Sequence, residues 1–246
     1  MLEFIIENKI YVGYFFELLA AISGNYYLHK TENALVSIKY LVYFLWFVLI
    51  IDVLTFYTIW AYFDDYKTFP WLKDSVFRRG MWMVNCYTIY SCSFYSFLFI
   101  KNIKQLRIKN KLTIALFVYI AVSIISLLLS KQFFQAYVMT PVFLGTGLLL
   151  ISIGMYFYEM MVSTELINFK TNLLFYISIG LIVWYLSIPP IQIYSSYFTV
   201  ENVEFISIFT TIKRYANVFM YGIFSFAFIY CAKKNQVRKT LKWGNL

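Results

Sequence analysis

Two carboxylates in the first quarter of the chain are the residues best placed to do chemistry. Glu17 and Asp52 each lie near the middle of a long apolar or aromatic stretch. A charge at the centre of a bilayer costs at least ~2.5–3.5 kcal/mol, so each group needs a partner or a proton. If they lie within about 6 Å of each other, they cannot both ionise easily. They are therefore a candidate proton or cation site, or an anchor for an amine-bearing ligand.

The third apolar stretch adds polar side chains at a similar depth. Asn85, Tyr87 and Tyr90 lie there among several serines, threonines and cysteines. Such a helix is expected in the centre of a bundle, where its polar groups find partners. These three residues, with Glu17 and Asp52, are the candidates for binding a ligand or a proton. The alternative is that both carboxyls are protonated, separate and structural, each bonded to a neighbouring Tyr, Ser or Asn.

The composition places these groups in a membrane protein. The chain is 61% hydrophobic and 13% charged, whereas a soluble domain carries about 25% charged residues. Its mean hydropathy is positive, and several apolar stretches reach the roughly 20 residues needed to cross a bilayer. The net charge of +9 gathers at the ends of these stretches, which favours a role in topology over nucleic-acid binding.

The apolar stretches predict a single all-α domain over residues 1–246, an integral membrane bundle of seven transmembrane helices. Small residues around Glu17 predict close packing of the first helix. The fourth stretch is plain and is expected to face lipid. Pro189 and Pro190 are expected to kink or break the sixth helix. The predicted spans are about residues 10–28, 40–63, 81–100, 112–130, 141–161, 172–197 and 216–232.

The distribution of lysine and arginine predicts the orientation. The links after the first, third and fifth spans and the C-terminal tail hold 13 of the 21 basic residues, and the N-terminus and the other links hold 8. The cytoplasmic side of a membrane protein is the richer one. The N-terminus is therefore expected outside and the C-terminus in the cytoplasm. The chain is expected to be a multi-pass protein of the cell membrane, in a bacterium the inner membrane.

Enzyme chemistry and cofactor sites find little support among the remaining residues. His29 is the one histidine, and no HExxH, GxSxG or P-loop pattern occurs. The three cysteines lie in apolar segments without a CxxC pair, which argues against zinc and disulfides. The predicted last span, 216–232, has no lysine to bind retinal as a Schiff base. We therefore expect a non-enzymatic protein without a metal or cofactor.

Three segments resemble a group of seven-span membrane proteins of Bacteroidetes, especially flavobacteria. They are FELLAAISGNYYLHK, KYLVYFLWFVLIIDV and NFKTNLLFYISIGLIVWYLSIPPI. Asp52 stands where similar segments carry Glu. The resemblance implies a gene neighbourhood with histidine kinases and response regulators, and hence a sensory or accessory role. It carries over no binding residues, since none is established for the group.

Two classes of function fit these observations. The first is a sensory or receptor-like module that signals to a cytoplasmic or membrane partner, such as a histidine kinase, through the basic link at 101–111 and the C-terminal tail. The alternative is a small proton-coupled or facilitative transporter that uses Glu17 and Asp52. An internal repeat would favour transport, and no convincing repeat joins the first and last three spans. The ligand stays open in both cases.

The predicted orientation can be tested with a reporter that is active only in the cytoplasm. Fused after Leu246, the reporter should be active, because the basic tail is retained on the inner side. Inserted within 64–80, between the second and third spans, it should be inactive. The opposite pattern would overturn the orientation. Western blots of both fusions control for expression.

Overall fold

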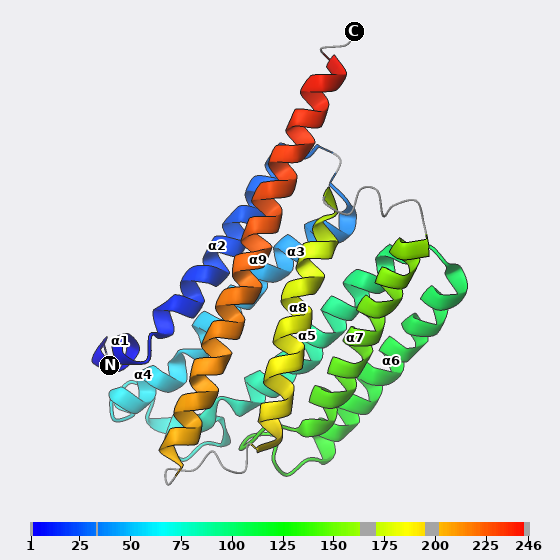
Figure 1. Cartoon of the computed structure of the whole chain (residues 1–246). Helices are drawn as coiled ribbons and strands as arrows, with labels where there is room; N and C mark the ends of the chain where they lie inside the picture. The colour runs from blue at the N-terminus through cyan, green and yellow to red at the C-terminus, as the bar shows by residue number, and fades with distance from the viewer. Residues whose placement is uncertain (1, 33, 163–170, 195–201, 244–246) are drawn as a thin grey trace.

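The chain folds as a bundle of long helices (Figure 1). It is described by a computed structural model that covers residues 2–32, 34–162, 171–194 and 202–243, with the backbone alone for residues 2 and 235–243. These residues contain helices and connections and no strand. In order, the elements are α1 (Leu2–Glu7), α2 (Ile10–Lys30), α3 (Val36–Thr55), α4 (Tyr57–Phe63), the short 3-10 helices η1 (Pro70–Leu72) and η2 (Val76–Arg79), α5 (Met81–Asn102), α6 (Leu106–Leu129), α7 (Met139–Val162), α8 (Leu173–Gln192) and α9 (Val203–Trp243).

Six of the long helices close a ring. Along it, α2 packs against α3 and α9, α3 against α5, α5 against α7, α7 against α8, and α8 against α9. Helix α6 packs against α5 and α7 at the edge of the bundle. The polar α5 therefore lies within the bundle and the plain α6 at its edge, in agreement with the predictions for the third and fourth spans.

Six segments of the described chain are long and apolar enough to cross a membrane, so the protein has the character of a multi-pass membrane protein. Helix α2 has 21 residues but is not among the six. Glu17, Asn25 and several tyrosines lower the hydropathy of its apolar stretch. The six segments are Val36–Phe63, Met81–Asn102, Leu106–Leu129, Met139–Val162, Leu173–Gln192 and Val203–Lys234.

The second predicted span is interrupted. The sequence predicts one helix over 40–63, but α3 ends one residue before Phe56 and α4 begins one residue after it. The backbone N–H of Phe56 donates to the carbonyl oxygen of Val53, 3.2 Å away. An α-helix would pair it with the carbonyl of Asp52. The interruption therefore leaves the backbone carbonyl of Asp52, a half-buried acidic residue, without its helical donor.

The last helix starts earlier than predicted. The sequence predicts a loop over 199–215, whereas α9 is one continuous helix over Val203–Trp243. Residues 199–201 lie outside the described part of the chain. The first turns of α9 bury Phe209 against Ile188 of α8. This tertiary contact stabilises as helix a stretch whose charged residues resemble a loop.

Helix α8 continues through the two prolines that were expected to interrupt it. Pro189 and Pro190 lie inside the helix, which ends at Gln192. Each proline lacks an N–H, so each removes one helical hydrogen bond. Because the helix ends two residues later, few turns depend on those bonds. The predicted end of this span, at 195–197, lies outside the described residues.

The half of the bundle from which the C-terminal part of α9 emerges is packed with apolar side chains. Two glycines allow the helices to approach closely there. A Cβ atom at Gly24 of α2 would lie 2.8 Å from Val42 of α3, and one at Gly180 of α8 would lie 3.3 Å from the backbone of Met220 of α9. The side chains that fill this half are fully buried and include Leu41, Phe99, Ile177, Leu181, Phe224 and Phe228.

A carboxylate from α7 caps the N-terminal end of α6. Glu159 accepts hydrogen bonds from the backbone N–H groups of Lys104, at 2.8 Å, and Gln105, at 3.0 Å. These donors precede the first turn of α6, where backbone N–H groups lack helical partners. The predicted basic link over 101–111 is mostly helical, and only 103–105 lies between α5 and α6. The sequence alone predicts no more than an interfacial position for Glu159.

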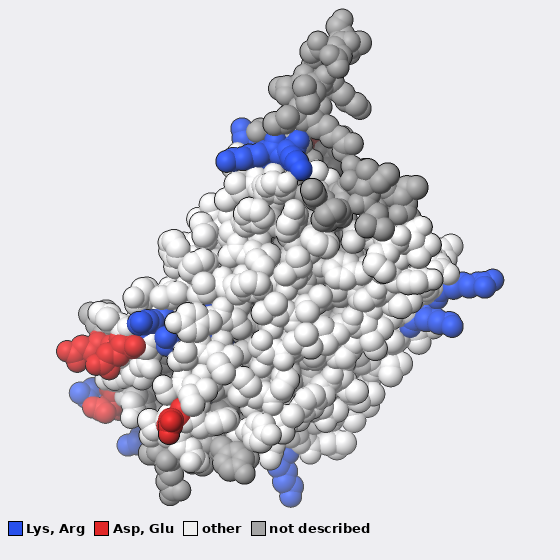
Figure 2. All heavy atoms as spheres, in the orientation of Figure 1, with Lys and Arg blue, Asp and Glu red and all other residues white. Residues whose placement is uncertain are grey.

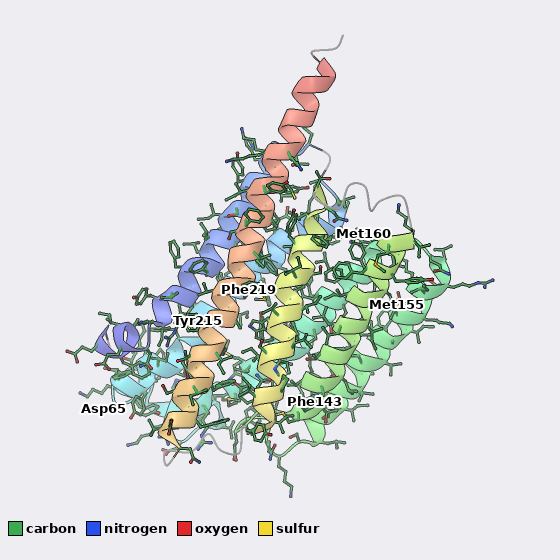
Figure 3. The ribbon with its side chains drawn as sticks, viewed as in Figure 1. Asp65, Phe143, Met155, Met160, Tyr215 and Phe219 are labelled. Carbon is green, nitrogen blue, oxygen red and sulfur yellow. The ribbon has the colours of Figure 1, made fainter. Side chains whose placement is uncertain are left out.

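The outer face of the bundle suits contact with lipid. Figure 2 shows that the broad middle of this face carries uncharged side chains, with charged groups toward its margins. Large apolar side chains project from it, among them Phe143 of α7 and Tyr215 and Phe219 of α9, all exposed (Figure 3). In a bilayer these side chains lie among the acyl chains.

Gly145 should tolerate no larger residue. A Cβ atom there would lie 2.5 Å from the Tyr119 hydroxyl and 2.7 Å from the Cys92 sulfur, whereas one at Gly147 would meet nothing within 4 Å. We expect Gly145→Ala to lower the free energy of unfolding by about 1–3 kcal/mol through overpacking. Gly147→Ala, the matched control, should be neutral or stabilising because it raises helix propensity. Thermal unfolding of the purified protein measures both, and equal effects would contradict the packing described.

Candidate functional site

A cavity of about 290 Å³ lies inside the ring, in the half of the bundle that holds the N-terminal parts of α2, α5 and α9. All six ring helices contribute lining residues, and α6 contributes none. Pockets for small molecules measure about 300–1,000 Å³, so this cavity suits a small solute. The opposite half of the bundle contributes no lining residue, because its apolar side chains pack against one another.

Glu17 and Asp52 line this cavity together. Glu17, from α2, is only 4% exposed, and Asp52, from α3, is half-buried. Their side chains lie close enough to interact electrostatically, and both line the same cavity. Two neighbouring carboxyl groups cannot both ionise easily, so the pair favours a proton on one of them. The two carboxyls therefore form a pair facing the bundle interior.

The interruption after α3 orders the backbone next to this pair. The carbonyl oxygen of Asp52 accepts hydrogen bonds from the hydroxyls of Thr55, at 2.7 Å, and Tyr14, at 3.1 Å. Tyr14 lies on α2, three residues before Glu17. Its bond therefore ties α2 to the end of α3 and holds the two carboxyl-bearing helices in register.

Three buried polar atoms at the cavity have no hydrogen-bond partner within the protein. They are Oε2 of Glu17, the hydroxyl oxygen of Tyr95 and Oγ1 of Thr146. Tyr95 is 2% exposed. A buried polar atom without a partner costs about 1–3 kcal/mol. Three such atoms around one cavity indicate that a ligand or ordered water completes their hydrogen bonds.

Aromatic side chains form much of the remaining wall. Trp184 of α8 donates its indole N–H to Oδ1 of Asn217 on α9, at 2.6 Å. The Tyr185 hydroxyl lies 3.5 Å from Oγ of Ser91 on α5. These contacts join α5, α8 and α9 around the cavity. The aromatic lining residues are Tyr14, Tyr87, Tyr95, Tyr137, Trp184, Tyr185 and Tyr221.

Lys213 is a cavity residue that sequence reasoning missed. It lies on α9, lines the cavity and acts electrostatically on both Glu17 and Asp52. The sequence placed it in a loop outside the last span. Reading the helix upstream from Asn217 would have placed Lys213 one turn away on the same face. The exclusion of covalent retinal rested on a last span without lysine, and that premise does not hold for α9.

The other predicted site residues fall in different places. Tyr87 lines the cavity, but Asn85 and Tyr90 do not line it. Tyr90 is exposed on the outer side of α5, with its ring centroid 5.5 Å from that of Phe44 and 4.7 Å from that of Phe47. Its position is that of an aromatic packing group facing outward.

Asn85 holds the connection between α6 and α7. Its Nδ2 donates to the carbonyl oxygens of Phe133 and Ala136, each at 2.9 Å, and its Oδ1 accepts from the N–H of Val138 at 3.1 Å. The side chain is 2% exposed. Asn85 thus satisfies three backbone groups of a non-helical segment. The predicted break residue Pro189, by contrast, lines the cavity from α8.

Metal-ligating groups are sparse in the part of the chain that the structure describes. No group of three or more histidine, cysteine, aspartate or glutamate side chains is close enough there to hold a metal ion. Cys92 lines the cavity as a buried free thiol, 3.8 Å from the Tyr185 hydroxyl. The arrangement suits hydrogen bonding and charge recognition.

Replacing Asn85 should weaken the fold rather than alter the cavity. Asn85→Ala leaves two carbonyl groups and one N–H of the α6–α7 connection without their partner, at a cost of about 1–3 kcal/mol. Thermal unfolding should show this loss. The adjacent, exposed Cys86 provides the control, since Cys86→Ala should change stability little. Equal stability of Asn85→Ala and Cys86→Ala would contradict a structural role for Asn85.

Comparison with known proteins gives no match from which a function could be inferred. No protein-family model matches the chain, and no curated protein and no solved structure matches it. The lining groups and the helices that carry them are therefore the basis for inferring its function.

Proposed function

We propose that this chain is a non-enzymatic, receptor-like sensory module of a bacterial inner membrane. The cavity binds a small solute at one end of the bundle, and α9 conveys its occupancy to a partner at the other end. The carboxyl pair, Tyr87 and the unpartnered polar atoms recognise the solute. The partner is a cytoplasmic or membrane protein such as a histidine kinase.

The continuity of α9 is the observation that carries this proposal. The helix has 41 residues, or about 60 Å at 1.5 Å per residue, whereas a bilayer core is about 30 Å thick. It lines the cavity through Lys213, Asn217, Met220 and Tyr221. Its other end extends past the remaining helices, away from the N-terminus (Figure 1). One unbroken element therefore contacts both the cavity and the surroundings of the opposite face.

The same proposal includes α2 as a seventh span. Its 21 residues give about 31 Å of helix, enough to cross the bilayer core. It packs along α9, one of the six apolar segments. Glu17, the main obstacle to insertion, is buried beside Asp52 rather than facing lipid. With seven spans the basic C-terminus lies in the cytoplasm and the cavity end lies outside.

The basic end of α9 is the expected contact with the partner. This stretch includes Lys233, Lys234, Arg238, Lys239 and Lys242. Near an anionic leaflet each contributes about 1 kcal/mol of attraction, which would also hold the helix end at the inner surface. The charge fits a membrane-associated partner with acidic groups and the lipid bilayer itself.

A small transporter is the competing function, and one observation favours it. Interrupted helices often lie beside substrate and ion sites in transporters, and the interruption between α3 and α4 adjoins Asp52. Transport, however, requires a second access route, and the packed half of the bundle contributes no residue to the cavity. We therefore rank sensing first.

A covalent occupant of the cavity should alter the far end of α9. Thr55→Cys, in a variant with all three native cysteines replaced by serine, places a thiol in the cavity wall. Benzyl methanethiosulfonate then provides a neutral occupant. We expect amide hydrogen exchange of residues 235–243 in lipid nanodiscs to change about fivefold or more, the lower end of typical allosteric coupling.

The control is the same modification at Gln132→Cys, an exposed position in the α6–α7 connection, which should leave residues 235–243 unchanged. Exchange changes confined to the cavity-lining segments would overturn the role of α9 in signalling. Accumulation of a solute inside proteoliposomes that depends on Glu17 and Asp52 would instead establish transport.

A further inference from the structure

We propose that the cavity takes a small organic ammonium ion, whose charged nitrogen lies at Glu17 and Asp52. This inference rests on the proposed function, because it names the class of ligand for the same site. It follows from the charge balance of the lining residues, the unpartnered carboxyl oxygen of Glu17, and the aromatic walls.

The charge balance leaves one acidic group to be compensated. Among the described lining residues, Glu17 and Asp52 are acidic and Lys213 is the one lysine or arginine. Lys213 is itself exposed, so its ammonium is shared with solvent. Without a ligand, the two neighbouring carboxyls cannot both ionise easily, so the pair keeps a proton. An ammonium ion brings a positive charge to replace that proton, which leaves to solvent as the ligand binds.

The acceptors around the pair fit an N–H donor. Oε2 of Glu17 is buried and has no partner within the protein. Helix α3 ends three residues after Asp52. The C-terminal end of a helix carries a partial negative charge and favours cations. An ammonium group offers up to three N–H donors, which Oε2 of Glu17 and the other carboxyl oxygens of the pair can accept.

The wall of the cavity favours an organic cation over an inorganic one. The rings of Tyr87, Tyr95 and Tyr221 line it, and aromatic faces attract ammonium groups. Calcium takes six to eight oxygen ligands, and no group of three or more acidic, histidine or cysteine side chains lies close enough together among the described residues to hold a metal ion. The hydroxyls of Tyr95 and Thr146, both unpartnered, are free to bond a polar substituent on the ligand.

The test compares two thiol reagents of similar size and opposite charge at the same cavity position. The reporter is Thr55→Cys in the cysteine-free variant, in lipid nanodiscs. The reagents are the trimethylammonium and the sulfonate forms of ethyl methanethiosulfonate. The ratio of their rates cancels any change in the reactivity of the thiol. The reference ratio comes from Gln132→Cys, exposed at the same end of the bundle.

We expect the cationic reagent to be favoured in the cavity about tenfold or more over the reference, since an acidic cleft concentrates cations by such factors. Glu17→Gln and Asp52→Asn should each move the ratio toward the reference. Lys213→Gln should raise it, because a competing cation is removed. Asp74→Asn, an exposed acidic residue, serves as the matched control and should have no effect.

A ratio equal to the reference, or a preference for the sulfonate, would overturn the proposal. Preference for the sulfonate that disappears in Lys213→Gln would assign the cavity to anions. The comparison of Thr55→Cys with Gln132→Cys uses proteins in which Glu17 and Asp52 are unchanged. It therefore decides the question even if Glu17→Gln and Asp52→Asn do not fold.

The two proposals fail separately. The coupling of the cavity to residues 235–243 is measured with a neutral occupant and does not depend on the charge of the ligand. A normal coupling with no cation preference would retain the receptor and reject the ammonium ligand. A cation preference without coupling would retain the ligand class and reject the receptor.

Discussion

A carboxyl group inside a bundle of membrane helices must have a partner, and Glu17 has another carboxyl. This constraint explains the arrangement at one end of the bundle. Helix α2 has to lie against α3 at the depth of Asp52, and Tyr14 fixes that register through the Asp52 carbonyl. The carbonyl is available because α3 ends just after it. A buried charge, an interrupted helix and an interhelical hydrogen bond thus depend on one another.

The bundle combines a rigid half and a hollow half. In the rigid half, Gly24 and Gly180 bring helices into close contact, and phenylalanines such as Phe224 and Phe228 fill the interior. In the hollow half, six tyrosines and one tryptophan line a cavity. Along α9, Tyr221 lines the cavity, and the next buried ring, Phe224, belongs to the packed half. A packed base of this kind resists deformation and positions the polar groups above it.

Several features were predictable from sequence because they depend on composition and helical periodicity. The apolar spans, the interior position of Glu17 and the edge position of α6 are of this kind, whereas the proximity of Glu17 to Asp52 was one of two alternatives. The early start of α9 was not predictable, because it depends on tertiary contacts. Phe209 packs against Ile188 of α8, and Lys213 lines a cavity to which five other helices contribute. Arg214 likewise donates to the carbonyl oxygen of Asn8, 206 residues away in sequence, at 2.6 Å. The role of Asn85 also depends on the α6–α7 connection, whose backbone path no local pattern reveals.

The length of α9 has a mechanical consequence. From Asn217, at the cavity wall, to its end at Trp243 the helix covers 26 residues, or about 39 Å. Over the first part of that length Phe224, Phe228 and Ala232 are fully buried between the neighbouring helices, which resist a sideways swing. A displacement along the helix axis meets no such obstacle of shape, and in a continuous helix it is the same at every residue. Movement of α9 at the cavity wall would therefore reach its far end undiminished, as a shift along the axis.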